Sequence, residues 1–507
     1  MIHVHAVPAK STNSATEERA QSHFLDMSSK KRGLIPLFIL SVIITLSACS
    51  ADKPAIDKMS ANRTASEKNT TNKADEDVGQ KKDPATEKKK TDAKNKILKK
   101  ASDGFFAGES EKDRAGFLDW FEKTYGDKTL ETIADNGVFD DSTVWQNSTG
   151  RTIKTLFWDY HAAAEDPFYK ANLRREIKTS KSGEAEFLFS GDLTLAEHTA
   201  TTVLMDKNPN LLSQCFDQSL MDTMRSADFF TVNNEFCYGT KNIGKPISGK
   251  TFTFRADPKR AKLLNRIGVD LVSLANNHVY DYGKDAFLYT LSTLKKDKVP
   301  YVGAGKNLTE AKRAYYVTAD GRTVAILAGT QIERSANYTK AVAADSPGVL
   351  KCLNPTEYVR AIRTAKKYAD TVFVICHWGT EGTHQYGDDQ TKLAKKFIKE
   401  GADAVIGGHT HTLQAVEYVD SAPVFYSLGN FFFSTTMKQP KGYDTGLAKI
   451  TVKRNGKISA EFIPCRFSGG KTSKLKSGSA KYRRVISDMN SWSQTAVIQK
   501  NGMIKRK

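Results

Sequence analysis

The sequence predicts an α/β fold of alternating strands and helices, preceded by an export signal, a tether and a small helical module. Three observations lead to this prediction: short aliphatic runs that end in glycine or polar clusters, helical stretches between most of these runs, and a polar, Lys-rich segment near the amino terminus. The chain has 507 residues, of which 39% are hydrophobic and 26% charged. This composition is typical of a soluble globular protein with enough length for an enzyme.

Residues 1–49 are predicted to hold an export signal. The run GLIPLFILSVIITLSACS follows a basic triplet and is too short to span a membrane comfortably, which is typical of a cleaved secretory signal. Its end, Leu-Ser-Ala-Cys, resembles a bacterial lipobox, which implies cleavage before Cys49 and attachment of lipid to that residue; an uncleaved membrane anchor is the alternative. We expect translation to start at Met27, and the protein to be lipid-anchored on the extracytoplasmic face of the cell membrane.

Residues 50–100 contain almost no large apolar side chains, so they cannot bury enough surface to offset the entropy lost on ordering. We expect a disordered, Lys-rich tether in this segment. From 101 to 180, as in FLDWFEKTYGDKTLETIADNG, apolar residues recur every three or four positions, which is helical periodicity. This stretch is interpreted as a small helical module, with Gly126 and Gly137 as helix stops.

From residue 181 the pattern changes to short β-branched and aliphatic runs: AEFLFSGDLTL, GVDLVSLANNH, TVAILAG, DTVFVICHWG and ADAVIGGHTH. Helical stretches such as DPKRAKLLNRIG and DDQTKLAKKFIKEG lie between most of them. The alternation predicts an α/β domain with buried sheets over residues 181–468. The remaining basic segment, 469–507, has partial helical spacing and is expected to pack against this domain.

The net charge of +19 has two interpretations. Lysines keep a surface protein soluble and near anionic lipid or wall polymer, or they attract a polyanionic substrate. Five of the six cysteines remain beside Cys49 and show no C-x-x-C spacing. A disulfide-stapled domain is therefore not expected, although one pair stays open.

Polar side chains gather just past the predicted strand ends, where α/β folds place their sites. They are Asp192, Glu235, Asn276, Asn277, His278, His377, His409 and His411. Carboxylate, carboxamide and imidazole groups from separate strand ends form a ligand set suited to Zn²⁺, Mn²⁺ or Fe²⁺. Each residue alone has a plain structural alternative, such as a hydrogen-bonded turn, but the coincidence of five strand ends favours a metal site.

His409 and His411 lie two residues apart, directly after Gly407 and Gly408. In an extended segment, residues two apart point to the same side, so both imidazoles are expected to face one site. The two glycines allow that backbone to come close to its neighbours.

Six motifs in this order, GD, NNE, ANNHVYDYG, HWGTEG, GADAVIGGHTH and PVFYSLGNFFFS, resemble the CapA family of bacterial poly-γ-glutamate capsule proteins over roughly residues 184–468. The family's domain is related to calcineurin-like metallophosphoesterases, so the resemblance implies a four-layer αββα sandwich. It also implies a part in the synthesis, export or anchoring of poly-γ-glutamate. The alternatives are a metal-dependent phosphoesterase or γ-glutamyl amide hydrolase of the envelope, and a non-catalytic polymer-binding factor.

The metallophosphoesterase pattern implies a set of ligands for one or two divalent ions: Asp192, Glu235, Asn277, His377, His409 and His411. His278, the histidine of the Asn-His pair, is implied to be catalytic by protonating the leaving group or steadying charge. Two features depart from the pattern. Leu193 and Thr194 follow Asp192 where the pattern has Asp-x-His, and Glu235 follows two asparagines where Gly-Asp is usual. A single or weakly held ion is therefore compatible with the resemblance.

Three further residues are expected to support the site. Asp281 lies three residues beyond His278 and is able to hold its ring, Glu381 lies four beyond His377, and Asn430 follows an apolar strand. The phenylalanines after Asn430 are expected to belong to the core. The resemblance implies an anionic polymer and membrane-bound capsule synthase components as partners, and no nucleic acid.

Overall fold

The computed structural model describes residues 84–100, 111–125, 160, 174–207, 212–332, 338–435 and 442–507. The export signal, the start at Met27, the lipobox Cys49 and the first part of the tether lie outside the described residues. None of the described helices is both long enough and apolar enough to cross a membrane.

Helix α1 (Pro84–Lys100) occupies the end of the segment that was expected to be disordered, so that expectation was wrong for these residues. Lysine, glutamate and alanine are strong helix formers, and Lys94 Nζ bonds the Asp119 carboxylate of helix α2 (Glu111–Tyr125) at 2.6 Å. Helix α2 lies in the predicted helical module. Apart from Tyr160 and the strand β1 described below, the rest of that module lies outside the described residues.

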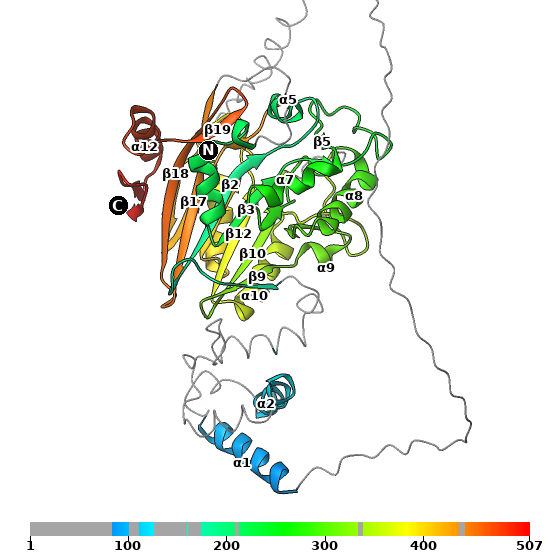
Figure 1. The fold of residues 1–507 in the computed structure, drawn as a ribbon, viewed down its shortest axis with the longest axis vertical. Coiled ribbons are helices and arrows are strands. Elements are labelled where there is room, and N and C mark those ends of the chain that lie inside the picture. Colours follow the sequence, from blue (N-terminus) through cyan, green and yellow to red (C-terminus); the bar gives the residue numbers. More distant parts are fainter. Residues whose placement is uncertain are drawn as a thin grey trace, which may run out of the picture. The chain divides into compact units, whose positions relative to one another are not determined.

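Two mixed sheets form the centre of the α/β domain (Figure 1). The first sheet has seven strands, in the order β1 (Arg174–Ile177), β9 (Tyr315–Ala319), β10 (Arg322–Thr330), β12 (Thr371–His377), β13 (Ala404–Gly408), β15 (Ala422–Phe425) and β14 (Val416–Val419). The second sheet has eight strands, in the order β19 (Lys471–Lys474), β18 (Ile458–Ser468), β17 (Tyr443–Lys453), β2 (Glu184–Leu193), β3 (Phe229–Asn234), β6 (Leu271–Ser273) and β7 (Tyr301–Val302), with β16 (Asn430–Phe432) beside β2.

Alternation along the strands separates the layers. Phe187 and Phe189 of β2 pack between the sheets against Phe373 of β12, with ring centroids 5.5 and 5.8 Å apart, whereas Leu188 faces outward. Helices α6 (Gln218–Ser226), α7 (Ala261–Arg266) and α8 (Gly283–Lys296) cover the second sheet, and α10 (Thr356–Tyr368) and α11 (Asp388–Lys399) cover the first. The predicted four-layer αββα sandwich is confirmed.

Shorter elements complete the domain. They are α5 (Ala200–Lys207), η3 (Leu212–Gln214), η4 (Pro258–Arg260), α9 (Leu308–Ala311), and the strand pairs β4 (Cys237–Tyr238) with β5 (Arg255–Ala256) and β8 (Ala304–Gly305) with β11 (Gly348–Val349). Among the described residues the cysteines are all buried free thiols, namely Cys215, Cys237, Cys352, Cys376 and Cys465.

Both ends of the domain extend beyond the predicted limits of 181 and 468. Strand β1, which was expected in the helical module, pairs in parallel with β9 of the first sheet. Its sequence RREI is too short and polar to indicate a strand. At the other end, β19 pairs with β18, and helix α12 (Ala480–Trp492) places Val485 and Met489 in the core between the sheets. The strands β20 (Ala496–Ile498) and β21 (Ile504–Arg506) then form a hairpin.

The strands that deliver polar residues are parallel neighbours. In the second sheet β2, β3 and β6 run side by side, and in the first sheet β10, β12 and β13 do the same. Because parallel neighbours end at the same edge of a sheet, their carboxyl-terminal loops meet there. The topology therefore brings together side chains that lie far apart in the sequence.

Candidate metal centre

The predicted ligands come from the carboxyl ends of five strands. Asp192 lies near the end of β2, Glu235 directly follows β3 and Asn277 lies shortly after β6. His377 is the last residue of β12, and the His409 to His411 turn follows β13. All of these side chains are buried except His411, which is partly exposed.

Three of these residues form the heart of the site. Glu235, His377 and His409 each offer a ligand atom, and these atoms lie within 4.8 Å of one another. His377 Nε2 lies 3.4 Å from Glu235 Oε1 and 3.1 Å from His409 Nδ1. Glu235 Oε1 is buried and has no hydrogen-bond partner among the described residues. An unsatisfied buried oxygen beside two imidazole nitrogens is costly for the protein alone but fits a divalent cation.

The other three predicted ligands surround this group. Asp192 Oδ2 accepts a hydrogen bond from the backbone N–H of His409 at 3.0 Å and lies 3.7 Å from His411 Nδ1. Asn277 Oδ1 lies 2.8 Å from His377 Nε2. The structure thus brings all six predicted ligands into one cluster.

Asn233 is a member of the cluster that the sequence analysis did not select. Its Nδ2 donates to Asp192 Oδ1 at 2.8 Å and to Glu235 Oε2 at 3.1 Å, and it lies 3.2 Å from His377 Nδ1. One carboxamide therefore orients two carboxylates. Its position two residues before Glu235 on a strand was the available signal, because residues two apart share a face.

Asn276, by contrast, is not a ligand. Its Nδ2 donates to Asn233 Oδ1 at 3.0 Å, and its Oδ1 accepts from the backbone N–H groups of His278 and Val279 at 3.1 and 3.0 Å. The side chain holds the turn after β6 and supports Asn233.

Burial shapes the protonation of the site. It raises the pKa of Asp192, and it raises the pKa of Glu235 well above its usual range, where the neighbouring Asp192 carboxylate adds to the effect. Burial also lowers the pKa of His377 and of His409 well below the usual range, and the nearby imidazoles lower both further. The lowered pKa values keep His377 and His409 in the neutral form that ligates a metal ion, and a bound cation would favour the ionised form of the two carboxylates.

His278 lies beside the cluster in a hydrogen-bonded chain. Its Nδ1 lies 2.7 Å from Oδ2 of the fully buried Asp281, as the sequence predicted. Asp281 also accepts from the backbone N–H of Phe254 at 2.7 Å and pairs with Lys250. Burial lowers the pKa of His278 even though Asp281 opposes this effect. Sequence reasoning missed Lys250, which lies in an irregular loop without a motif.

Asn430 contacts the cluster directly, whereas Glu381 lies at its solvent-exposed rim. Asn430 pairs with Asp192 in the register of β16 and β2, and its Oδ1 accepts from His411 Nδ1 at 2.7 Å. Glu381 is 59% exposed, and its Oε1 lies 4.0 Å from His409 Nε2 at the rim of the site. The phenylalanines that follow Asn430 are buried in the core, as expected.

The turn that carries the two histidines corrects one detail of the prediction. His409 and His411 adopt left-handed φ angles of 91° and 59°, so the segment is a turn and not extended. Both rings nevertheless lie at the site, with centroids 6.0 Å apart. The close approach attributed to the glycines is present: a Cβ on Gly408 would lie 2.7 Å from Asp192 Oδ1, and one on Gly407 would lie 1.9 Å from the backbone oxygen of Tyr426.

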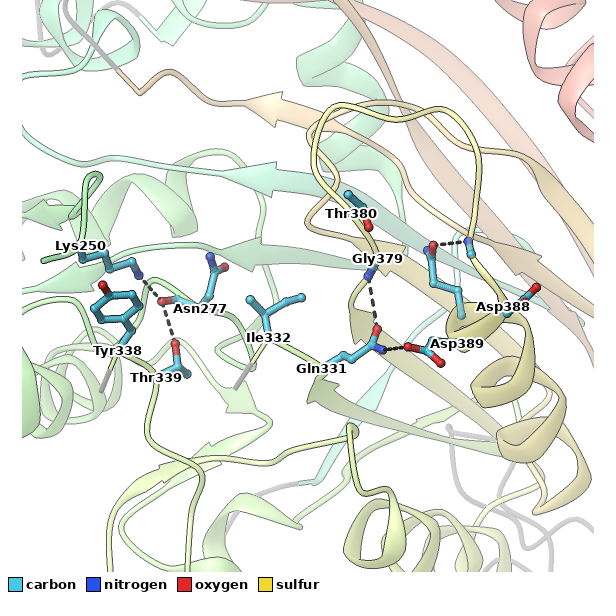
Figure 2. Close-up of a pocket in the computed structure, with 12 residues that line it drawn as sticks. Lys250, Asn277, Gln331, Ile332, Tyr338, Thr339, Gly379, Thr380, Asp388 and Asp389 are labelled. Atoms are coloured by element: carbon cyan, nitrogen blue, oxygen red, sulfur yellow. Dashed lines mark hydrogen bonds between the residues drawn. The ribbon is translucent and has the colours of Figure 1, made fainter. Parts of the chain in front are cut away.

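Two cavities adjoin the cluster. One, of about 490 Å³, is lined by Lys250, Asn277, Gln331 and Asp389 among others, and Figure 2 shows Lys250 and Asn277 on one side of it with Gln331 and Asp389 on the other. A second cavity, of about 240 Å³, is lined by residues that include His411. The first cavity, next to convergent polar groups, has a size that is typical of ligand sites.

The family model described as "Bacterial capsule synthesis protein PGA_cap" matches residues 186–435, which include all six predicted ligands. The chain is also 30% identical over 317 residues to the "PGA biosynthesis protein CapA" of Bacillus subtilis (strain 168), over 62% of this chain and 80% of that protein. The chain belongs to this capsule synthesis family. Within the family it is also 30% identical over 276 residues to the "Capsule biosynthesis protein CapA" of Bacillus anthracis, over 52% of this chain and 65% of that one.

Among solved structures, the 5'-nucleotidase from Candida albicans SC5314 shows a weak likeness. The TM-score is 0.30 and the identity 11%, over 57% of this chain and 53% of that chain. A likeness at this level has no bearing on the function of this family member.

Proposed function

We propose that this protein acts on the outer face of the cell membrane, lipid-anchored through Cys49, and takes part in the synthesis, export or anchoring of poly-γ-glutamate through a divalent-metal site. The observation that carries the proposal is the buried group of Glu235, His377 and His409, in which Glu235 Oε1 has no hydrogen-bond partner among the described residues. The names of the Bacillus relatives, which refer to capsule and PGA biosynthesis, support this polymer as the substrate or cargo.

The metal would be Mn²⁺, Zn²⁺ or Fe²⁺, since the donors are carboxylate, carboxamide and imidazole groups. The residues that would hold it are Asp192, Glu235, Asn277, His377, His409 and His411. When bound, such an ion polarises a phosphoryl or carbonyl oxygen and lowers the pKa of water. This chemistry serves hydrolysis of a phosphoester or of a γ-glutamyl amide.

His278 would handle the proton in this reaction. Asp281 accepts the Nδ1 hydrogen of His278, which fixes the tautomer and leaves Nε2 able to accept a proton. Because burial lowers its pKa, His278 is uncharged before substrate arrives. It would therefore accept a proton at Nε2 from the attacking water and then donate that proton to the leaving group.

A non-catalytic role in polymer binding is the second candidate. Thr194 stands where the metallophosphoesterase pattern has a histidine ligand, and its Oγ1 instead accepts the backbone N–H of Ala196 at 3.2 Å. The loss of that ligand favours a single ion. A single ion would hold polymer carboxylates without the paired metals of a binuclear phosphoesterase.

Elemental analysis of the purified protein after exposure to Mn²⁺ or Zn²⁺ tests the metal site. Near-stoichiometric metal is expected in the native protein and in His198→Ala, which removes an exposed histidine outside the cluster, but not in a correctly folded His409→Ala, His411→Ala variant. A native protein that stays empty would refute the proposal. Hydrolysis of phosphodiester or γ-glutamyl substrates that is lost in His278→Ala would distinguish the enzyme from the binding factor.

A further inference from the structure

The end of the chain concentrates positive charge. Residues 471–507, here called the C-terminal basic segment, hold ten Lys or Arg residues and one Asp, a net side-chain charge of +9 out of +19 for the whole protein. Exposed members include Lys476, Lys481 and Arg483 near the start of α12, and Lys505 and Arg506 on β21. The segment begins beyond residue 435, where the match to the family model ends.

Little of this charge is compensated within the protein. Among the residues that the structure describes, Arg484 is the single cation of the segment with a carboxylate within 4 Å, and it contacts Asp444 at 2.6 Å and Asp488 at 2.9 Å. Elsewhere in the domain exposed cations are often paired, as in Arg454 with Asp320. The remaining nine positive charges are available to an external anion.

The segment is attached to strand β14 of the first sheet and to the residues that follow His411. The buried carboxylate of Glu417 accepts hydrogen bonds from the backbone N–H groups of Gln494 and Thr495, both at 2.6 Å. Two residues before Gln494, Trp492 at the end of α12 stacks on the His384 ring, with the ring centroids 4.3 Å apart. His384 Nδ1 in turn donates to the backbone oxygen of Leu413, two residues beyond His411, at 2.6 Å.

One face of α12 leads from solvent to the metal centre. Arg484, Asp488 and Trp492 line the 240 Å³ cavity together with His411. Lys481 lies three residues before Arg484 and so on the same face of the helix, but it is exposed. Along this face, the exposed Lys481 is followed by Arg484, which lines the same cavity as the predicted metal ligand His411.

We propose that the C-terminal basic segment is a docking surface for a polycarboxylate chain, which it guides along α12 into the cavity at His411. The inference rests on the proposed function, because it takes poly-γ-glutamate as the polyanion. A flexible chain with regularly spaced carboxylates fits both parts of this path, since it can follow exposed cations and also enter a narrow cavity. An anionic membrane surface fits the cations but cannot enter the cavity.

The test compares two triple variants that remove the same charge from different places. Lys476→Gln, Lys481→Gln, Arg483→Gln neutralises exposed cations around the start of α12, and Lys395→Gln, Lys396→Gln, Lys399→Gln neutralises exposed cations on α11. Binding of labelled poly-γ-glutamate to the purified protein is measured by fluorescence anisotropy at low and high salt. Exposed ion pairs contribute about 0.2 to 1 kcal/mol each, so the first variant is expected to raise Kd at least about threefold at low salt. The second is expected to change it less than about twofold, and both effects should shrink at high salt.

Each other outcome overturns the inference. Equal weakening in both triple variants would mean that the polymer responds to net charge alone. A second outcome is unchanged polymer binding in the α12 variant together with loss of polymer binding in the His409→Ala, His411→Ala variant. The polymer would then bind at the metal centre without contacting the segment, which supports the proposed function and refutes this inference. A defect confined to anionic phosphatidylglycerol vesicles would identify a membrane contact. A native protein that takes up metal but binds no polymer would refute the polymer part of the proposed function as well.

Discussion

Replacing Glu235 by Gln should stabilise the metal-free protein while removing most of the stabilisation that a metal provides. Glu235 is fully buried beside the Asp192 carboxylate, and its Oε1 has no hydrogen-bond partner among the described residues. Leaving a buried polar group unsatisfied costs about 1 to 3 kcal/mol. The amide keeps the shape of the side chain but cannot carry a negative charge beside Asp192, so removing this buried charge should recover about this amount.

The expected shift in Tm follows from these energies and from the size of the domain, because the unfolding entropy scales with the number of residues. For roughly 330 residues, an unfolding entropy of about 2.1 cal/mol/K per residue means that 1 kcal/mol shifts Tm by about 1.4 °C. Metal-free Glu235→Gln should therefore melt about 1.5 to 4 °C above the native protein. A metal ion at a concentration about a hundred times its Kd stabilises the native state by about 2.7 kcal/mol, which raises Tm by about 4 °C. The variant should lose most of this increase in Tm.

Differential scanning calorimetry with EDTA and with Mn²⁺ or Zn²⁺ measures both effects. Glu417→Gln is a matched control, because Glu417 is also buried but accepts hydrogen bonds from Gln494, Thr495 and Tyr386. Its amide would place a donor against these donors, so the control should melt lower. A metal-free Glu235→Gln that melts at or below the native protein, or that keeps the full metal response, would refute the reasoning.

The difference in Tm between the native protein and Glu235→Gln should depend on pH. The pKa of Glu235 is raised above its usual value of 4.5, so the native state holds a proton that the unfolded state has already lost. The contribution of this group to stability is present below pH 4.5 and is lost as pH rises through the folded pKa. The Tm advantage of metal-free Glu235→Gln should therefore widen as pH rises above 4.5, and an advantage that narrows would contradict this assignment.

Three further predictions concern the backbone of the site, the core and the anchor. Gly408→Ala would bring a methyl group to 2.7 Å from Asp192 Oδ1, so elemental analysis should show loss of metal, whereas Gly387→Ala, which has open space around it, should bind normally. Phe373→Ala removes a ring packed between the sheets and should lower the free energy of unfolding by about 3 to 5 kcal/mol in urea titrations; a loss below about 1 kcal/mol would contradict the inter-sheet core. Cys49→Ala should release the protein from membrane fractions into the medium, and retention in the membrane would favour an uncleaved anchor.

The sequence by itself determined the fold class and most of the residues of the site. Aliphatic runs of strand length and helices with one apolar face are local patterns, and they predict a layered α/β domain without knowledge of long-range contacts. Asp192, Glu235, His377 and His409 were identifiable because each directly ends or follows such a run. What a side chain is able to bind depends on its functional group, so the ligand chemistry was also readable from the residue types.

Only the tertiary structure decided which groups touch. The backbone of His409 reaches Asp192 across 217 residues, and that contact depends on the order of the strands in both sheets. Asn233 contacts Asp192 and His377 on strands that are distant in the sequence, and its one local signal was its spacing from Glu235. Lys250 pairs with Asp281 from an irregular loop that no local pattern marked. The polar strand β1 belongs to the first sheet because β9 supplies its hydrogen-bond partners, and its own sequence did not indicate a strand. The packing of the C-terminal residues was expected, but the structure decided that β19 extends the second sheet and that α12 contributes to the core.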